Sequence, residues 1–432
     1  MHIYFSGIGG AGIGPLALIA YQAGYEVSGS DSQHSQYTDR LINLGIRLHI
    51  GQTKEQIQIE DEAHPIDWIV FSSAVFITNP NNPELLYAQG KNIRTSKRDE
   101  CLNMILESNK LKLVAVAGTH GKTTTTALII WMLKQLNVPT SYSVGAKIGI
   151  NNNGKKEEMG QFDINSEYFV YECDEFDRNF LSFRPYLSII TIVDWDHHDI
   201  YLTAEDYKQA FRQFINQSKH SFILDRDYNY LGLIKNRNIT VVEHQNNQLK
   251  QIKLPGLHNR QNALIAIKAL VDKFSFDEDT LIGVANSFPG SSRRFENIAP
   301  NIYSDYAHTP EEIAATMQLA SEISNNIVVV YEPLTDRRQH YMKELYKDVF
   351  KKAKKIYWLP SYLAREDPNV PVITPKELIS SLNNSNLAEE ASKDDSLKSN
   401  IQAHANNGDV VICMAGGGGD SLDEWIRRNL IL

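Results

Sequence analysis

Two glycine-containing segments of this chain have the residue types that surround phosphate groups in proteins. The second of them, VAVAGTHGKTTTT at residues 114–126, places Gly121 and Lys122 between an apolar run and a helix-like run. In a strand–turn–helix unit of this kind, the lysine reaches phosphate oxygens and the hydroxyl of Thr123 can bind Mg²⁺. The Walker pattern expects a glycine where this chain has Val116, so we expect a shorter turn. An ordinary turn with a solvated lysine is the alternative, although four consecutive threonines are poor helix formers.

Two predicted strands end in side chains that can serve such a loop. The apolar run YFVYE ends in Glu172, and the run LSIITIV is followed by DWDHHDIY. Because the carboxyl ends of parallel strands meet at one edge of a sheet, we expect these acids and histidines to lie near the loop. The paired histidines fit either a metal or phosphate role or an ordinary structural role. Of the acids that follow Glu172, we expect Glu175 and Asp177 to be solvated at the strand end.

The first glycine-containing segment, GIGGAGIG at residues 7–14, satisfies the pattern G-x-G-x-x-G with Gly7, Gly9 and Gly12. Asp31 follows near the position at which a dinucleotide-binding fold keeps the acid that binds ribose. Taken alone, the segment predicts an NAD site and hence an oxidoreductase. The same turn at a helix N-terminus can hold the diphosphate of another nucleotide, because it recognises the pyrophosphate and little else.

The elements that position these residues predict an α/β protein of three domains. Short β-type runs alternate with helix-like runs along the 432-residue chain, a length that exceeds one compact core. We expect an N-terminal Rossmann-like parallel sheet at 1–106, a central P-loop-type ATP-binding α/β domain at 107–292 and a C-terminal Rossmann-like α/β domain at 293–432.

The composition argues against several classes of function. The formal charge is −9 and the sequence has no basic stripe, which argues against nucleic-acid binding. No apolar run reaches the ~18 residues of a membrane helix, and the N-terminus has no signal-peptide pattern, so we expect no membrane partner. The three cysteines, Cys101, Cys173 and Cys413, lack metal spacing and suit a reducing compartment. We therefore expect a cytoplasmic protein, as a monomer or a weak homodimer.

Six motifs together resemble the Mur ligase family, the ATP-dependent amide-forming enzymes of peptidoglycan precursor synthesis in cell wall biogenesis. They are GTHGKTTTT, YECDEFD, VDWDHHDIY, LHNRQNALIAI, RRFE and DYAHTPEEI, in the family's order and approximate spacing over essentially the whole chain. The resemblance implies ATP and Mg²⁺ as cofactors, with UDP-N-acetylmuramate and an amino acid, most simply L-alanine, as the substrates. The substrate carboxylate would attack the γ-phosphorus of ATP to give an acyl phosphate, which the amine would then attack.

The resemblance also implies roles for individual residues. Lys122, Glu172 and His197 would be catalytic. Thr123, Glu172 and His197 would hold metal ions, with His197 preferred over His198. The residues that would bind ATP are Gly118, Thr119, His120, Gly121, Lys122, Thr123, Thr124, Asn259, Asn262, Arg294 and Asp305. The residues that would bind the UDP-sugar are Gly7, Gly9, Gly10, Ala11, Gly12, Asp31 and Ser72. Arg294 and Asp305 belong to the third domain, so closure of that domain would complete the site.

The segment that holds the incoming amino acid in alanine-adding relatives departs from the family pattern. The usual His-Arg pair is replaced by Leu334 and Thr335, whereas Arg338 keeps the place of the later arginine and would bind the amino acid. The identity of the amino acid therefore stays open, and a murein peptide ligase that adds a recycled tripeptide is the alternative within the family. An NAD-dependent oxidoreductase is the alternative from another class, and it leaves the loop at Lys122 without a function.

Overall fold

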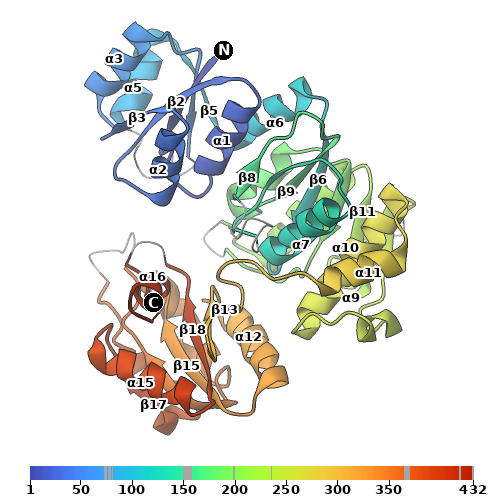
Figure 1. The fold of residues 1–432 in the computed structure, drawn as a ribbon, viewed down its shortest axis with the longest axis vertical. Coiled ribbons are helices and arrows are strands. Elements are labelled where there is room, and N and C mark those ends of the chain that lie inside the picture. Colours follow the sequence, from blue (N-terminus) through green and yellow to red (C-terminus); the bar gives the residue numbers. More distant parts are fainter. Residues whose placement is uncertain are drawn as a thin grey trace. The chain divides into compact units, whose positions relative to one another are not determined.

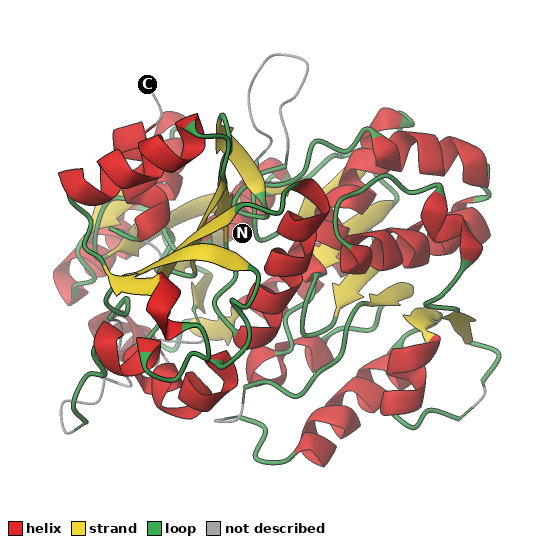
Figure 2. Cartoon of the chain, turned by 90° about the horizontal axis from the view of Figure 1, so that it is seen from below, coloured by secondary structure: helices red, strands yellow, loops and turns green. Residues whose placement is uncertain are grey.

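The computed structural model describes residues 1–430 apart from 73–74, 76–78, 80, 149–157, 198–199, 235, 364–369 and 418–419. The described residues form three sheets, one in each of three successive parts of the chain (Figure 1). Helices flank the strands of these sheets (Figure 2). The predicted α/β class with three sheets is confirmed, and the second and third sheets are mixed because each has one antiparallel strand.

The first sheet is entirely parallel and has the strand order β3-β2-β1-β4-β5. The direction of the connections reverses between β1 and β4, the point at which open α/β sheets bind ligands beyond the carboxyl ends of their strands. The strands are β1 (His2–Ser6), β2 (Glu26–Asp31), β3 (Arg47–Ile50), β4 (Trp68–Phe71) and β5 (Arg94–Lys97). The helices are α1 (Gly14–Gln22), α2 (Gln36–Asn43), α3 (Lys54–Ala63), α5 (Pro83–Lys91) and α6 (Arg98–Ser108).

The second sheet has the order β12-β11-β10-β6-β9-β7-β8, and β6 lies between β10 and β9. These three strands are parallel, so the loops that follow them emerge at one edge, as expected. The strands are β6 (Lys112–Ala117), β7 (Thr140–Ser143), β8 (Gly160–Gln161), β9 (Tyr168–Glu172), β10 (Leu187–Ile190), β11 (Ser221–Leu224) and β12 (Ile239–Val242). The helices are α7 (Lys122–Gln135), α8 (Ala204–Gln217), α9 (Asp225–Tyr230), α10 (Leu257–Phe274) and α11 (Glu278–Asn286), with 3-10 helices at Phe176–Ser182 and Asn247–Lys250.

The third sheet has the order β13-β14-β18-β15-β16-β17, with β13 antiparallel to β14. The apolar run of β15 is buried along its whole length, as the sequence of a central parallel strand predicts. The strands are β13 (Glu296–Ala299), β14 (Ile302–Asp305), β15 (Ile327–Glu332), β16 (Ala353–Trp358), β17 (Ala388–Glu390) and β18 (Val410–Ala415). The helices are α12 (Pro310–Ile323), α13 (Asp336–Met342), α14 (Pro375–Ile379), α15 (Asp395–Asn406) and α16 (Leu422–Leu430), with 3-10 helices at Lys343–Tyr346 and Ser385–Leu387.

The chain divides into two compact units. The first comprises Met1–Ile252 and Gln261–Phe288, and the second comprises Lys253–Arg260 and Pro289–Leu432. The first two sheets share one unit because one cluster of buried apolar side chains runs from Ile3 to Leu231. Contacts between α1 and β8 join the same two parts of the chain, and directly after β8 the backbone N–H of Phe162 donates to the side chain of Gln22 at 2.7 Å. The predicted boundaries at 106/107 and 292/293 remain predictions. Among the described residues, no helix has the length and apolar character to span a membrane.

Candidate active site

The turn between β6 and α7 is fixed by the neighbouring strand β10. Gly118 has φ of +147°, and a Cβ at this position would overlap the hydroxyl of Thr191. The backbone N–H of Thr119 donates to the carbonyl of Ile192 at 2.7 Å, and its hydroxyl donates to the carbonyl of Asp194 at 2.6 Å. Gly121 has φ of +84° and forms the N-cap of α7, so the helix starts at the lysine as the sequence predicts. The result is a rigid turn whose helix N-terminus carries a partial positive charge.

The ammonium group of Lys122 is held by three groups around this turn. Its Nζ donates to the carbonyls of Gly118 at 2.7 Å and Thr119 at 3.0 Å, and it lies 2.8 Å and 3.0 Å from the two carboxylate oxygens of Glu175. The prediction that Glu175 is solvated is wrong, because its side chain is only 1% exposed. Burial alone would lower the pKa of Lys122, but the nearby carboxylates, with Glu175 first among them, together outweigh burial and raise it. The ammonium group therefore stays charged.

Glu175 also holds His197. The Nε2 atom of His197 lies 3.3 Å from Glu175 and 3.8 Å from Asp196, and the ring of Phe176 packs edge-on against the imidazole. His197 has φ of +54°, an uncommon conformation for a non-glycine residue. Burial lowers the pKa of His197, yet the hydrogen bond to Glu175 raises it above the usual value. His198 lies outside the described residues.

Asp177, the other acid expected to be solvated at the strand end, forms an ion pair. Its carboxylate lies 2.7 Å from the Nζ of Lys97, and its side chain is 25% exposed. Asp177 is therefore partly exposed, and a lysine from the first sheet's part of the chain compensates its charge. Unlike Glu175, it does not contradict the expectation of a solvated acid.

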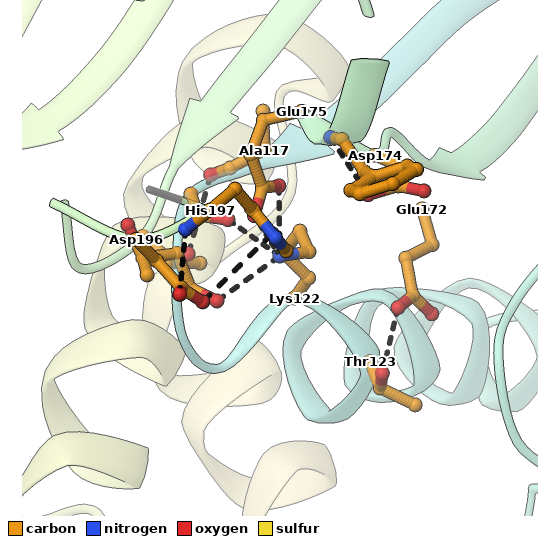
Figure 3. Close-up of polar contacts among 12 residues, drawn as sticks. Ala117, Lys122, Thr123, Glu172, Asp174, Glu175, Asp196 and His197 are labelled. Atoms are coloured by element: carbon orange, nitrogen blue, oxygen red, sulfur yellow. Dashed lines mark hydrogen bonds and ion pairs between the residues drawn. The ribbon is translucent and has the colours of Figure 1, made fainter. Parts of the chain in front are cut away.

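Glu172 and Thr123 form a second, separate pair. The hydroxyl of Thr123 donates to Glu172 at 2.7 Å, and the backbone N–H of Gly145 donates to the other carboxylate oxygen at 2.6 Å. Figure 3 shows this pair apart from the group of Lys122, Glu175 and His197. A hydroxyl and a carboxylate are the hard oxygen donors that Mg²⁺ takes alongside phosphate and water. The pair fits that ion, although the described residues hold no group of three metal-binding side chains.

Asn262 lies against the same turn. Its side chain is 2% exposed, its Nδ2 and Oδ1 have no hydrogen-bond partner among the described residues, and a Cβ on Gly121 would overlap its Nδ2. Buried amide groups without partners are rare and costly, so the predicted role of Asn262 in binding ATP would give this amide a partner. That role remains a prediction. Asn259, three residues earlier on α10, belongs to the other compact unit and donates to the carbonyl of Pro255 at 2.9 Å.

The glycine-rich turn after β1 is the other candidate phosphate-binding turn. The backbone N–H groups of Gly7 and Ile8 both donate to the carbonyl of Ser30 at 2.9 Å, and Gly7 has φ of +79°. Asp31 accepts from the backbone N–H of Gly9 at 2.8 Å, so its carboxylate ties the turn to the end of β2. The predicted Gly10, Ala11 and Gly12 are exposed to solvent, and Ser72 at the end of β4 faces Gly7.

The predicted site residues of the second compact unit, which are Arg294, Asp305 and Arg338, each contact neighbouring residues of that unit. Asp305 accepts from the backbone N–H groups of Phe295 at 2.7 Å and Ala307 at 2.8 Å, and burial raises its pKa. The guanidinium of Arg294 lies 4.9 Å from the ring centroid of Tyr306. In α13, Nη1 of Arg338 lies 3.3 Å from Nε2 of His308. The proposed roles of Arg294, Asp305 and Arg338 in binding remain predictions.

Comparison with known proteins gives consistent matches along the chain. Residues 2–110 match the Mur ligase family catalytic domain, residues 116–249 the Mur ligase middle domain, and residues 293–417 the Mur ligase glutamate ligase domain. The chain is similar to the UDP-N-acetylmuramate--L-alanine ligase of Clostridium perfringens, with 33% identity over 84% of each chain. The corresponding ligase of Clostridium botulinum is 30% identical over 96% of this chain and 95% of the relative.

Solved structures show the same fold. The UDP-N-acetylmuramate-alanine ligase of Thermotoga maritima has a TM-score of 0.75 with 24% identity, covering 100% of this chain and 98% of that one. A murein peptide ligase of Psychrobacter arcticus has a TM-score of 0.61 with 21% identity, again covering 100% and 98%. At these identities the likeness supports the three-part architecture.

Proposed function

Because the chain belongs to the Mur ligase family, we propose that it joins the carboxylate of UDP-N-acetylmuramate to L-alanine at the expense of ATP. The chain is an ATP-dependent, amide-bond-forming ligase of peptidoglycan synthesis, as its curated relatives indicate. The names of those relatives support the choice of both substrates. The replacement of the usual His-Arg pair by Leu334 and Thr335 makes the amino acid the part of the proposal that most needs a test.

The observation that carries the proposal is the charged Lys122 at a phosphate-type turn, beside a Thr123–Glu172 pair that fits Mg²⁺. A carboxylate and a triphosphate repel each other, so bringing them together needs fixed positive charge. In the proposed reaction Lys122 neutralises the transferring phosphoryl group. His197, whose pKa is raised by Glu175 and Asp196, would orient the incoming carboxylate. The bound Mg²⁺ would supply further charge neutralisation at Glu172.

A single assay of phosphate release tests this proposal. The full-length chain is supplied with ATP, Mg²⁺ and UDP-N-acetylmuramate, and then with alanine, glycine, serine or the murein tripeptide in turn. We expect release that depends on both UDP-N-acetylmuramate and alanine, and that is lost in Lys122→Ala. Release with the tripeptide alone would identify a murein peptide ligase. Turnover of NADH without ATP would support the dinucleotide interpretation of the first loop and contradict the proposal.

The proposal extends to the cellular setting. We place the reaction in the cytoplasm, where a reducing environment suits three free, buried cysteines. We also propose a monomer or a weak homodimer without nucleic-acid or membrane partners, which sedimentation of the purified chain at several concentrations would test.

A further inference from the structure

One arginine contacts both the glycine-rich turn after β1 and the acidic segment after β9. Arg98 is the first residue of α6, directly after β5 in the first sheet. Its Nη2 donates to the carboxylate of Asp174 at 3.1 Å, in the acidic segment that follows β9. Its Nη1 lies against Gly12 of the glycine-rich turn, where a Cβ would overlap it. A single guanidinium therefore contacts parts of both sheets within the first compact unit.

Gly12 leaves room for the guanidinium of Arg98. Gly12 does not adopt a left-handed backbone conformation, unlike Gly7 in the same turn. A Cβ at residue 12 would overlap Nη1 of Arg98, so a side chain there would displace the guanidinium. The G-x-G-x-x-G pattern predicted a close approach of backbone and ligand at this turn, but gave no indication of a cation beside it.

The contact with Asp174 occupies only part of the guanidinium of Arg98, so the rest can bind a ligand. Asp174 takes one hydrogen bond from Nη2, and the Asp174 side chain is 37% exposed. Arginine has five N–H donors in a planar fork that matches two phosphate oxygens at once. The side of the fork that carries Nη1 lies against Gly12, the last residue of the solvent-exposed stretch at residues 10–12. A diphosphate held at the backbone N–H groups of that stretch would lie within reach of Nη1.

We propose that Arg98 is a ligand of the diphosphate of the UDP-sugar, which it binds together with the backbone of the glycine-rich turn. This inference rests on the proposed function, because it assumes that the turn holds a nucleoside diphosphate. The chain is acidic overall, and a helix N-terminus supplies only about half a positive charge. Arg98 supplies a full charge at the diphosphate. Its bond to Asp174 keeps the side chain oriented toward the turn before the ligand arrives.

Binding of UDP and UMP to the full-length chain, measured by titration calorimetry, tests this inference. We expect Arg98→Met to weaken UDP binding by about tenfold or more, the size of one lost charge-assisted hydrogen bond. UMP, which lacks the second phosphate, should lose less. Equal losses for UDP and UMP would indicate a general distortion of the turn and would overturn the inference.

Two further variants separate direct contact from a structural role. Asp174→Asn removes the negative charge of the same ion pair but keeps an amide oxygen that can accept the hydrogen bond from Nη2. The guanidinium therefore stays oriented toward the turn, and we expect UDP affinity equal to or higher than that of the wild type. Weakening as large as in Arg98→Met would overturn the inference. Lys97→Met is the matched control, because Lys97 forms an ion pair with Asp177 at 2.7 Å between the same two segments. We expect no change in its UDP affinity.

The failure of this inference can be told apart from the failure of the proposed function. If the wild-type chain binds neither UDP nor UMP, the glycine-rich turn is not a UDP-sugar site and the proposed function fails. If the wild type binds UDP and Arg98→Met binds it equally well, only the role of Arg98 fails. Should Arg98→Met not fold, Arg98→Gln decides, because it removes the charge but keeps a long polar side chain. UDP affinity unchanged in Arg98→Gln would then overturn the inference.

Discussion

The buried ion pair between Lys122 and Glu175 gives a sharp prediction about stability. Glu175→Gln keeps the size of the side chain and one carbonyl oxygen but removes the charge. Glu175 is 1% exposed and Lys122 is 15% exposed, so solvent cannot replace the lost carboxylate. The pKa of Glu175 is held below its usual value, because Lys122 and His197 outweigh the effect of burial. Removing this charge leaves the ammonium of Lys122 and the imidazole of His197 without their shared carboxylate.

The magnitude follows from the burial of the pair. Removing one partner of a buried ion pair costs about 3–5 kcal/mol, because the remaining charge is left uncompensated. In a folded unit of this size, about 3 kcal/mol corresponds to a fall of roughly 6 °C or more in the melting temperature. ATP would restore the missing negative charge at Lys122. We therefore expect ATP to raise the melting temperature of Glu175→Gln by more than it raises that of the wild type.

Thermal denaturation with and without ATP and Mg²⁺ measures both effects. Glu205→Gln is the matched control, since it makes the same chemical change in the ion pair of Glu205 with Arg212, where Glu205 is 68% exposed. Solvent screens such a pair, so we expect its melting temperature to match that of the wild type. The reasoning is refuted if Glu175→Gln melts like Glu205→Gln, or if ATP stabilises Glu175→Gln less than the wild type.

Three further predictions concern other contacts. Glu172→Gln should raise the Mg²⁺ concentration for half-maximal phosphate release by about tenfold or more, and an unchanged midpoint would contradict its role. Gly121→Ala places an alanine in a left-handed conformation, at a cost of about 1 kcal/mol or more, and its Cβ would overlap the amide of Asn262. The rise in melting temperature that ATP causes should therefore be smaller in this variant than in the wild type. An equal rise would contradict a role of this turn in binding ATP. Arg260 donates to Glu322 and holds the pKa of Glu322 at about 2. The ionised Glu322 therefore stabilises the fold fully above about pH 4.5, and this stabilisation is lost as the pH falls toward 2. The difference in melting temperature between wild type and Glu322→Gln should therefore shrink from about pH 6 to about pH 3, and a constant difference would show that the pair contributes nothing.

Much of the site could be predicted from the sequence because it depends on local structure. The alternation of β-type and helix-like runs placed Lys122 at the start of a helix, and it placed Glu172 at the end of a strand. Both lie where predicted. Parallel strands bring their carboxyl ends to one edge, so the approach of the segment around His197 to the loop also followed from topology. These inferences needed only periodicity and the geometry of parallel sheets.

Glu175 could not be placed in this way, because its burial depends on the path of the chain after the strand ends. The backbone N–H of Cys173 continues the ladder with Val116, and the chain then turns through Asp177 and Arg178, both with left-handed φ values. No local propensity predicts such a turn for residues other than glycine. One signal was available, since a lysine at a buried turn requires a counter-ion nearby.

The contacts of Lys122 bear on how a triphosphate would enter the site. All three of its N–H donors are already used, by the carbonyls of Gly118 and Thr119 and by Glu175. When Lys122 binds a phosphate it exchanges one set of hydrogen-bond partners for another. The net gain in binding free energy is therefore smaller than for an ammonium group with no protein partners. The carboxylate of Glu175 is also shared with His197, so moving Lys122 toward a phosphate leaves that carboxylate paired. Moving Lys122 away from Glu175 therefore costs little free energy, because the buried carboxylate of Glu175 keeps its contact with His197.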